Sequence, residues 1–162
     1  MTKLTQEYLN SLFEYREGEL YRKTKSHTRA VIGERVGVIT PQGYVQVGIK
    51  YRYHYAHRLI FLMHHGYMPE IVDHIDGNKT NNKIENLREA TSRQNNQNQS
   101  LHRNNTSGIK GVMWNKSQNR WVARCGFNGK YYHLGNFTDK ELAKKAVEKF
   151  RAQHHKEYAR HT

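Results

Sequence analysis

Cysteine is almost absent from this sequence, and so is any long apolar run. The 162 residues include a single cysteine, Cys125, so no disulfide can form within the chain. A free cysteine without partners is typical of proteins that fold in a reducing compartment. No apolar run reaches the length of a membrane span, and the N-terminus lacks the apolar segment of a signal peptide. These absences predict an intracellular protein with neither disulfides nor a zinc site built from paired cysteines.

Acidic residues are scarce relative to basic ones. The chain carries 27 Lys and Arg against 14 Asp and Glu, which gives a formal net charge of +13. Most of the imbalance lies in residues 97–162, where 13 basic residues stand against 4 acidic ones. A basic protein of this kind most often binds a polyanion, usually nucleic acid, although a solvated basic face would give the same counts.

Aliphatic residues are limited too. Hydrophobic residues make up 36% of the chain, and the mean hydropathy is −0.99. Eleven tyrosines compensate in part, because each ring buries a large area. Small cores in a chain of this length favour two compact modules over one large domain. We therefore expect an α+β protein with a first module over residues 1–98, a polar linker over 99–106 and a second module over 107–162.

The first module begins with a β-rich part, residues 1–56. Apolar and polar residues alternate on both sides of Glu17-Gly18 and of Pro41-Gln42-Gly43, which predicts strand-turn-strand segments in a small antiparallel sheet. An apolar stripe over His57–His65, followed by Gly66, predicts a helix and its end. The part over residues 57–98 therefore starts with a helix.

Several histidines and basic residues of this module have two interpretations. Four histidines have no cysteine or carboxylate at zinc-ligand spacing, so packing or hydrogen bonding is the simpler role for them: His54, His57, His64 and His65. Four basic residues could touch DNA or merely solvate the edge of the sheet: Lys23, Lys25, Arg29 and Lys50.

The stretch from Ile71 to Asn95 combines an acidic residue, a histidine and several asparagines between short apolar anchors. Asp73 offers a hard oxygen ligand and Asn95 an amide oxygen, and both suit a magnesium-like ion that keeps several waters. Histidine is the residue type whose charge ordinarily changes near neutrality, so His74 is a candidate general base. A solvated turn rich in Asn, Asp and Gly is the alternative interpretation.

The local pattern of this stretch predicts strand, loop, strand and helix. Ile71-Val72 leads into Asp73-His74 as the end of a strand, and Asp76-Gly77 opens a loop. Leu87–Ala90 is a second short strand candidate, and Thr91 with Gln94 has the spacing of a capping box. If Asp73 and His74 both lie on a strand, their side chains point in opposite directions.

Asp73-His74, Asn86-Leu87 and Gln94-Asn95 together resemble the motif of HNH endonucleases with a ββα-metal fold, of the kind found in phage and intron-encoded homing endonucleases. The resemblance implies that Asp73 and Asn95 hold a divalent metal, that His74 activates water, and that Asn86 orients the loop by hydrogen bonds. Asn95 stands where the family often has histidine, a variant that occurs in the homing branch. Many members also carry paired cysteines for zinc, which this chain lacks.

The second module shows three strand candidates and one helix. The strands are expected over residues 109–114, 120–127 and 130–134, with Asn128-Gly129 as a hairpin turn between the last two. Thr138 and Glu141 have capping-box spacing. The helix that follows is expected to bury Leu142, Ala146, Val147 and Phe150.

Gly111-Val112, Trp121-Val122-Ala123 and Leu134–Phe137, together with the helix, resemble an AP2 domain over roughly residues 107–158. The resemblance implies a sheet that lies in the DNA major groove. Trp121 and Ala123 are expected to face the helix, while Arg120 and Arg124 share the opposite face. By strand alternation, Lys110 and Tyr132 are further candidates for the exposed face, and Trp114 and Lys116 could join them. The candidate DNA contacts are Arg103, Lys110, Trp114, Lys116, Arg120, Arg124, Lys130 and Tyr132.

These features predict a metal-dependent endonuclease of the homing type that hydrolyses double-stranded DNA, as a monomer or homodimer on DNA and without a membrane. Mg²⁺ is the expected ion, and Mn²⁺ can substitute. If a phage carries the gene, the protein would act in the host cytoplasm. A non-catalytic AP2-type DNA-binding regulator is the main alternative. An RNA-binding protein is a weaker one, because no stacking aromatics in a known sheet motif are present.

Overall fold

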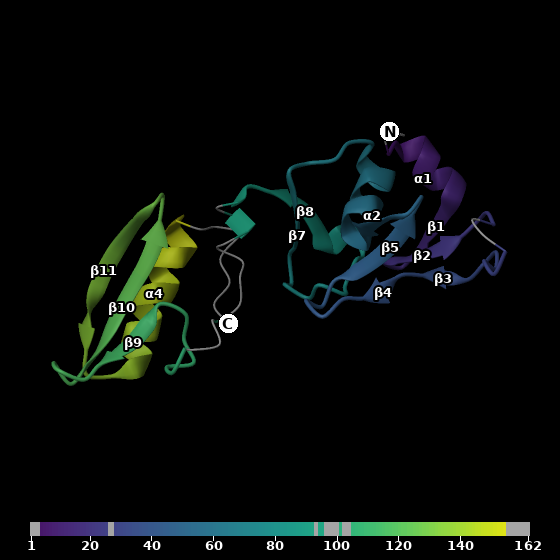
Figure 1. Ribbon diagram of the computed structural model, residues 1–162. Helices are drawn as coiled ribbons and strands as arrows, with labels where there is room; N and C mark the ends of the chain where they lie inside the picture. Colours follow the sequence, from purple (N-terminus) through teal and green to yellow (C-terminus); the bar gives the residue numbers. More distant parts are fainter. Residues whose placement is uncertain (1–3, 26–27, 93, 96–100, 102–104, 155–162) are drawn as a thin grey trace. The chain divides into compact units, whose positions relative to one another are not determined.

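The computed structural model describes residues 4–25, 28–92, 94–95, 101 and 105–154 (Figure 1). The chain divides into two compact units, residues 1–91 and residues 92–162. The predicted contact Arg103 lies outside the described residues. Within the described part, no helix has both the length and the apolar character needed to cross a membrane.

The first unit begins with helix α1 (Gln6–Leu12), which leads directly into a β-hairpin of β1 (Phe13–Arg16) and β2 (Glu19–Arg22). Thr5 caps the helix, because its hydroxyl accepts from the Tyr8 N–H at 3.2 Å. The hairpin predicted around Glu17-Gly18 is confirmed, and both turn residues have positive φ. Strand β3 (Arg35–Val36) pairs with β2 and completes a three-stranded sheet in the order β1-β2-β3.

A second three-stranded sheet follows, with β4 (Val38–Ile39), β5 (Val45–Ile49) and β6 (Arg52–Tyr55) in that order. The expectation of one small sheet was therefore too simple. Gly37, at φ +120°, separates β3 from β4, and a Cβ there would lie 2.6 Å from Cγ1 of Val45. The chain can make this break only at glycine, so the apolar run over residues 36–39 is divided between two sheets.

Helix α2 (Ala56–His65) forms the centre of the first unit's core. It ends at Gly66 in the left-handed conformation, as the sequence predicts. Leu59 and Ile60 are fully buried and pack with Leu9 of α1 and Leu20 of β2. The helix thus connects both sheets to the hairpin that carries the candidate site.

That hairpin consists of β7 (Ile71–His74) and β8 (Leu87–Ala90), which pair antiparallel. A short 3₁₀ helix, η1 (Ile84–Asn86), precedes β8 and was not predicted. Ser92, Gln94 and Asn95 have helical backbone, as expected after the second strand. The predicted order of strand, loop, strand and helix is therefore confirmed over the described residues.

The second unit is a three-stranded antiparallel sheet with α4 (Lys140–His154) packed on one face (Figure 1). Its strands are β9 (Val112–Asn115), β10 (Arg120–Phe127) and β11 (Lys130–Phe137), in the order β11-β10-β9. Strand β9 starts later than predicted, because Gly111 has φ +85° and ends the turn before it. Val112, Ala123, Ala143 and Val147 form the core.

Two predictions about α4 were wrong. Asp139 caps the helix instead of Thr138, because its carboxylate accepts from the Glu141 N–H at 2.6 Å. Leu142 is 50% exposed, whereas the adjacent Ala143 is fully buried. Val147 is buried and Ala146 packs against the core, as predicted. The buried stripe of the helix consists of Ala143, Val147 and Arg151, and Arg151 donates to the Lys110 carbonyl at 2.9 Å.

Candidate active site

Asp73 and His74 occupy the last two positions of β7, and both are buried. Across the hairpin, Asp73 stands opposite Arg88 and His74 opposite Leu87. Neighbouring residues on a strand point to opposite sides. The two side chains therefore enter different surroundings, and each finds a partner of its own.

Asp73 forms a mostly buried ion pair with Arg88. Its Oδ2 accepts from Nε of Arg88 at 3.1 Å and from Nη2 at 3.0 Å. The guanidinium compensates the buried carboxylate and holds its orientation, while removal of one partner would leave an uncompensated charge. Sequence reasoning missed Arg88, because the predicted order of strand, loop and strand does not state which residues stand opposite one another.

His74 is held by a buried amide. Its Nε2 lies 2.9 Å from Oδ1 of Asn82, and Asn82 is only 2% exposed. Since an amide oxygen only accepts, Nε2 carries the hydrogen, and a neutral ring then has its lone pair on Nδ1. Asn82 thus selects the tautomer in which Nδ1 can accept a proton. No signal in the sequence separated Asn82 from the other asparagines of the loop.

An aromatic cluster surrounds His74. The His57 ring lies 4.9 Å from that of His74, and Tyr44 lies 5.5 Å from His57 and 6.2 Å from His74. Burial, with smaller effects of His74 and Arg58, lowers the pKa of His57 to about 3, so the ring is neutral. Its Nδ1 is buried and has no hydrogen-bond partner in the structure. His57 therefore packs against the candidate base and retains one unused polar atom.

Asn86 ties together the loop between the two strands. Its Nδ2 donates to Oδ1 of Asp76 at 2.9 Å and to the Asn81 carbonyl at 2.8 Å, and its Oδ1 accepts from the Asp76 N–H at 3.0 Å. Its own carbonyl accepts from the Ile75 N–H at 2.9 Å. Asn86 thus holds the backbone of the residues that follow His74 by hydrogen bonds to the loop.

Asp76 is the acceptor at the centre of that loop. Partial burial alone would raise its pKa, but hydrogen bonds from the Asn81 side chain, the Asn78 N–H and the Asn86 side chain lower the pKa below its usual value. The carboxylate is therefore ionised at neutral pH, and the loop has a defined conformation next to the candidate base.

The donor set partly fits a divalent metal. Asp73 supplies hard carboxylate oxygens, and His57 has a buried ring nitrogen without a partner. Among the described residues, no three His, Cys, Asp or Glu side chains come together as metal ligands. A small number of protein ligands is sufficient for Mg²⁺, because this ion keeps several of its waters. Asn95 is half-buried and helical, and it belongs to the second unit.

In the second unit, Arg120 and Arg124 extend from the face of β10 opposite the helix. Both arginines are exposed. Ala123 and Cys125, the two neighbours of Arg124 along the strand, are buried on the other side of the sheet. The Arg124 guanidinium contacts the sulfur of Met113, its neighbour on β9, at 2.6 Å. The predicted alternation along β10 is confirmed.

Two other candidate contacts were assigned to the wrong face. Tyr132 stands opposite Cys125, and its ring lies 5.1 Å from Phe150 of α4. Trp114 stands opposite Trp121 at 4.9 Å, so it too lies on the helix side. Opposite partners in antiparallel strands share a face. By the same register Tyr131, 85% exposed, and His133 share the open face with Arg124.

The remaining lysine candidates lie at the ends of the strands. Lys116 is exposed in the turn after β9, and Lys130 is exposed at the start of β11. Lys110 is half-buried before β9. None of the three lies in the central part of the open face.

Comparison with known proteins gives a family match over the segment that contains the β7–β8 hairpin. Residues 54–97 match the family model described as HNH endonuclease. Protein 3.8 of Escherichia phage T7 is 38% identical over 71 residues, which make up 44% of this chain and 56% of the phage protein. The chain thus spans little more than half the length of this curated relative. No solved structure shows a significant match. Residues 54–97 therefore carry an HNH endonuclease domain, and Asp73, His74, Asn86 and Asn95 lie within it.

Proposed function

We propose that this protein is a metal-dependent endonuclease of the homing type that hydrolyses phosphodiester bonds at a specific site in double-stranded DNA. The observation that carries the proposal is the pair of buried neighbours Asp73 and His74, each held by a partner of its own within the matched segment. Burial of polar groups costs free energy unless they are hydrogen-bonded, and hydrogen bonds in a buried network fix the orientation of its side chains. This arrangement supports a chemical role for the hairpin.

In this proposal, His74 is the general base. The hydrogen bond to Asn82 orients the ring so that Nδ1 accepts a proton from the attacking water. Asn86 is the residue that keeps the loop, and hence the ring, in place. Hydrolysis would leave 5′-phosphate and 3′-hydroxyl ends.

The proposed metal ligands are Asp73 and Asn95. The bound ion is Mg²⁺, with Mn²⁺ as a substitute, and it would stabilise charge on the scissile phosphate and the leaving oxygen. Arg88 has a supporting role, because it orients the Asp73 carboxylate by two hydrogen bonds to Oδ2.

The second unit is proposed as the DNA anchor, an AP2-like module whose open face carries Arg120 and Arg124. The excess of basic residues in 97–162 supports this role. One active site per chain cuts one strand per visit, so a double-strand break would require a homodimer on DNA or a second visit.

The test is cleavage of a duplex that contains the gene's own genomic locus, with each strand labelled separately. Products are resolved on a denaturing gel after incubation with Mg²⁺ or with a chelator. Strand-specific cuts that require the metal would support the proposal. Specific binding without cleavage in any divalent metal would instead favour the non-catalytic DNA-binding regulator.

A further inference from the structure

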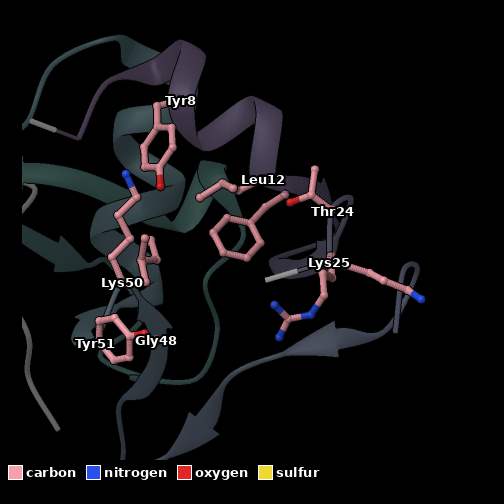
Figure 2. A pocket seen from close by; sticks show the side chains of 10 residues that line it. Tyr8, Leu12, Thr24, Lys25, Gly48, Lys50 and Tyr51 are labelled. Carbon is pink, nitrogen blue, oxygen red and sulfur yellow. The ribbon is translucent and has the colours of Figure 1, made fainter. Parts of the chain in front are cut away.

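The first unit contains a pocket at the opposite end of β5 from the candidate active site (Figure 2). It lies among α1, the end of β2 and the tip of the β5–β6 hairpin, and its volume is about 490 Å³. Volumes of this size are common for small-molecule sites. None of the catalytic candidates lines it.

The charge of the pocket is of one sign. Arg22, Lys25 and Lys50 line it, and no acidic residue of the described part of the chain does. Lys25 and Lys50 are exposed, so their ammonium groups are accessible to a ligand. An anionic group is therefore the complementary ligand at the rim.

The remaining wall is apolar and aromatic. Leu12, Phe13 and Ile49 form part of it, and Tyr8 and Tyr51 contribute rings, as Figure 2 shows in part. The Lys50 ammonium lies 4.9 Å from the centre of the Tyr8 ring. Aromatic and apolar walls next to cations suit a flat ring joined to a phosphate, because bases stack on aromatic side chains.

The hairpin tip has a backbone that its residues do not favour. Lys50 and Tyr51 form a two-residue turn between the paired Ile49 and Arg52, with φ of 44° and 65°. Turns of this kind strongly prefer Asn-Gly, and other residues there are strained. Tyr51 is also fully exposed. A ligand that contacts the side chains of Lys50 and Tyr51 would explain both the strained turn and the exposed Tyr51 ring.

We propose that this pocket binds one unpaired nucleotide of a DNA strand, with its base among the aromatic and apolar side chains and its phosphate beside Lys25 and Lys50. A base inside a duplex has both faces covered, so only an unpaired one can enter. The inference rests on the proposed action on DNA. Strand β5 links the pocket to Tyr44 beside His57, a distance of roughly 20 Å or about six nucleotides along one strand.

The turn itself provides a sharp test. The double variant Lys50→Asn with Tyr51→Gly gives the tip its preferred turn residues, so the fold should be as stable as before or more so. The same change removes one cation and one ring from the pocket. Arg52→Gln is the matched control, because it removes a cation from the same hairpin that does not line the pocket.

The full-length protein is titrated in chelator, by fluorescence anisotropy, with a paired duplex and with the same duplex carrying one unpaired nucleotide. The wild type and Arg52→Gln should prefer the second duplex by on the order of tenfold, the effect of one stacked base. The double variant should lose that preference, and the midpoint temperature of its thermal unfolding should be no lower than that of the wild type. Equal affinities in the wild type, or an unchanged preference in the double variant, would overturn the proposal.

Cleavage of the paired duplex with Mg²⁺ is measured in parallel. If the protein cleaves the duplex but shows no preference for the unpaired nucleotide, the proposed nucleotide binding in the pocket is rejected and the endonuclease proposal is not. A preference that depends on Lys50 and Tyr51, in a protein that never cleaves, supports the pocket and rejects the endonuclease proposal.

Discussion

The two units use polar side chains in opposite ways. In the β7–β8 hairpin, Asp73 and His74 are buried and each is held by a partner at 2.9–3.1 Å. On β10, Arg120 and Arg124 are exposed and extend from an open face. Chemistry needs a geometry set before the substrate arrives, whereas binding to phosphates tolerates long, mobile cations. The contrast predicts that changes at the β7–β8 hairpin alter the rate and that changes on the open face of β10 alter the affinity.

Loss of the metal should have the largest effect, and this effect should fall on cleavage and not on binding. Chelation, or Asp73→Ala, should abolish cleavage, because the scissile phosphate loses its charge stabilisation. Binding of the target in chelator should persist, as most of the net positive charge lies in residues 97–162. Full cleavage in excess chelator would show that the reaction needs no divalent ion. Added Mn²⁺ should restore activity to the wild type.

The next largest effect is expected from His74→Ala. Loss of one general base should lower the cleavage rate by on the order of 10²–10⁴-fold. Anisotropy should give the same affinity for target DNA as the wild type, because the side chain is buried. His64→Ala, a change at another histidine of the same unit, serves as the control. A variant at His74 that cuts at the normal rate would remove this residue from the mechanism.

A smaller effect is expected at Asn82, which acts through His74. Asn82→Leu removes the acceptor and should lower kcat by roughly 10–100-fold with little change in KM. Asn82→Asp keeps an oxygen near Nε2 and should recover much of the rate. If both variants lose kcat equally at unchanged thermal stability, the acceptor has no part in positioning the ring.

The second unit should show the opposite pattern. Arg120→Ala and Arg124→Ala should leave the rate at saturating DNA unchanged but weaken binding. A base-reading arginine would cost about 1–3 kcal/mol on the target and little on scrambled DNA. A phosphate contact would weaken both duplexes and reduce the salt slope by about one unit. Absence of any loss for both variants would mean that this face is not the DNA contact.

The smallest effects concern the core of the second unit. Val147→Ala should lower the free energy of unfolding by about 2 kcal/mol, because it opens a cavity in the core. Leu142→Ala should change it by less than about 0.5 kcal/mol, since that side chain is half-exposed. Denaturant unfolding of both variants checks this. Comparable losses of unfolding free energy in the two variants would mean that Leu142 belongs to the buried face of the helix, as the sequence predicted.

Local signals in the sequence predicted much of the fold correctly. Gly66 ends α2, Asn128-Gly129 forms the hairpin turn, and β10 has its predicted bounds. These features depend on neighbouring residues, through positive φ and alternation. The hairpin turn also determines that Tyr132 stands opposite Cys125, so the sequence contained the register that was misapplied to Tyr132.

Asp73, His74 and Asn86 were singled out in the sequence because their type, order and spacing resemble the HNH motif, and their catalytic and metal-binding roles stay predictions. Their partners were not singled out, because a hydrogen bond between residues far apart in the chain depends on how the loop folds back. Tertiary structure decided that Asn82, among many asparagines, reaches His74, and that Gly37 divides one apolar run between two sheets. It also decided that the helix buries Ala143 and leaves Leu142 half-exposed, because only the packing of the helix on the sheet determines which of its sides is covered.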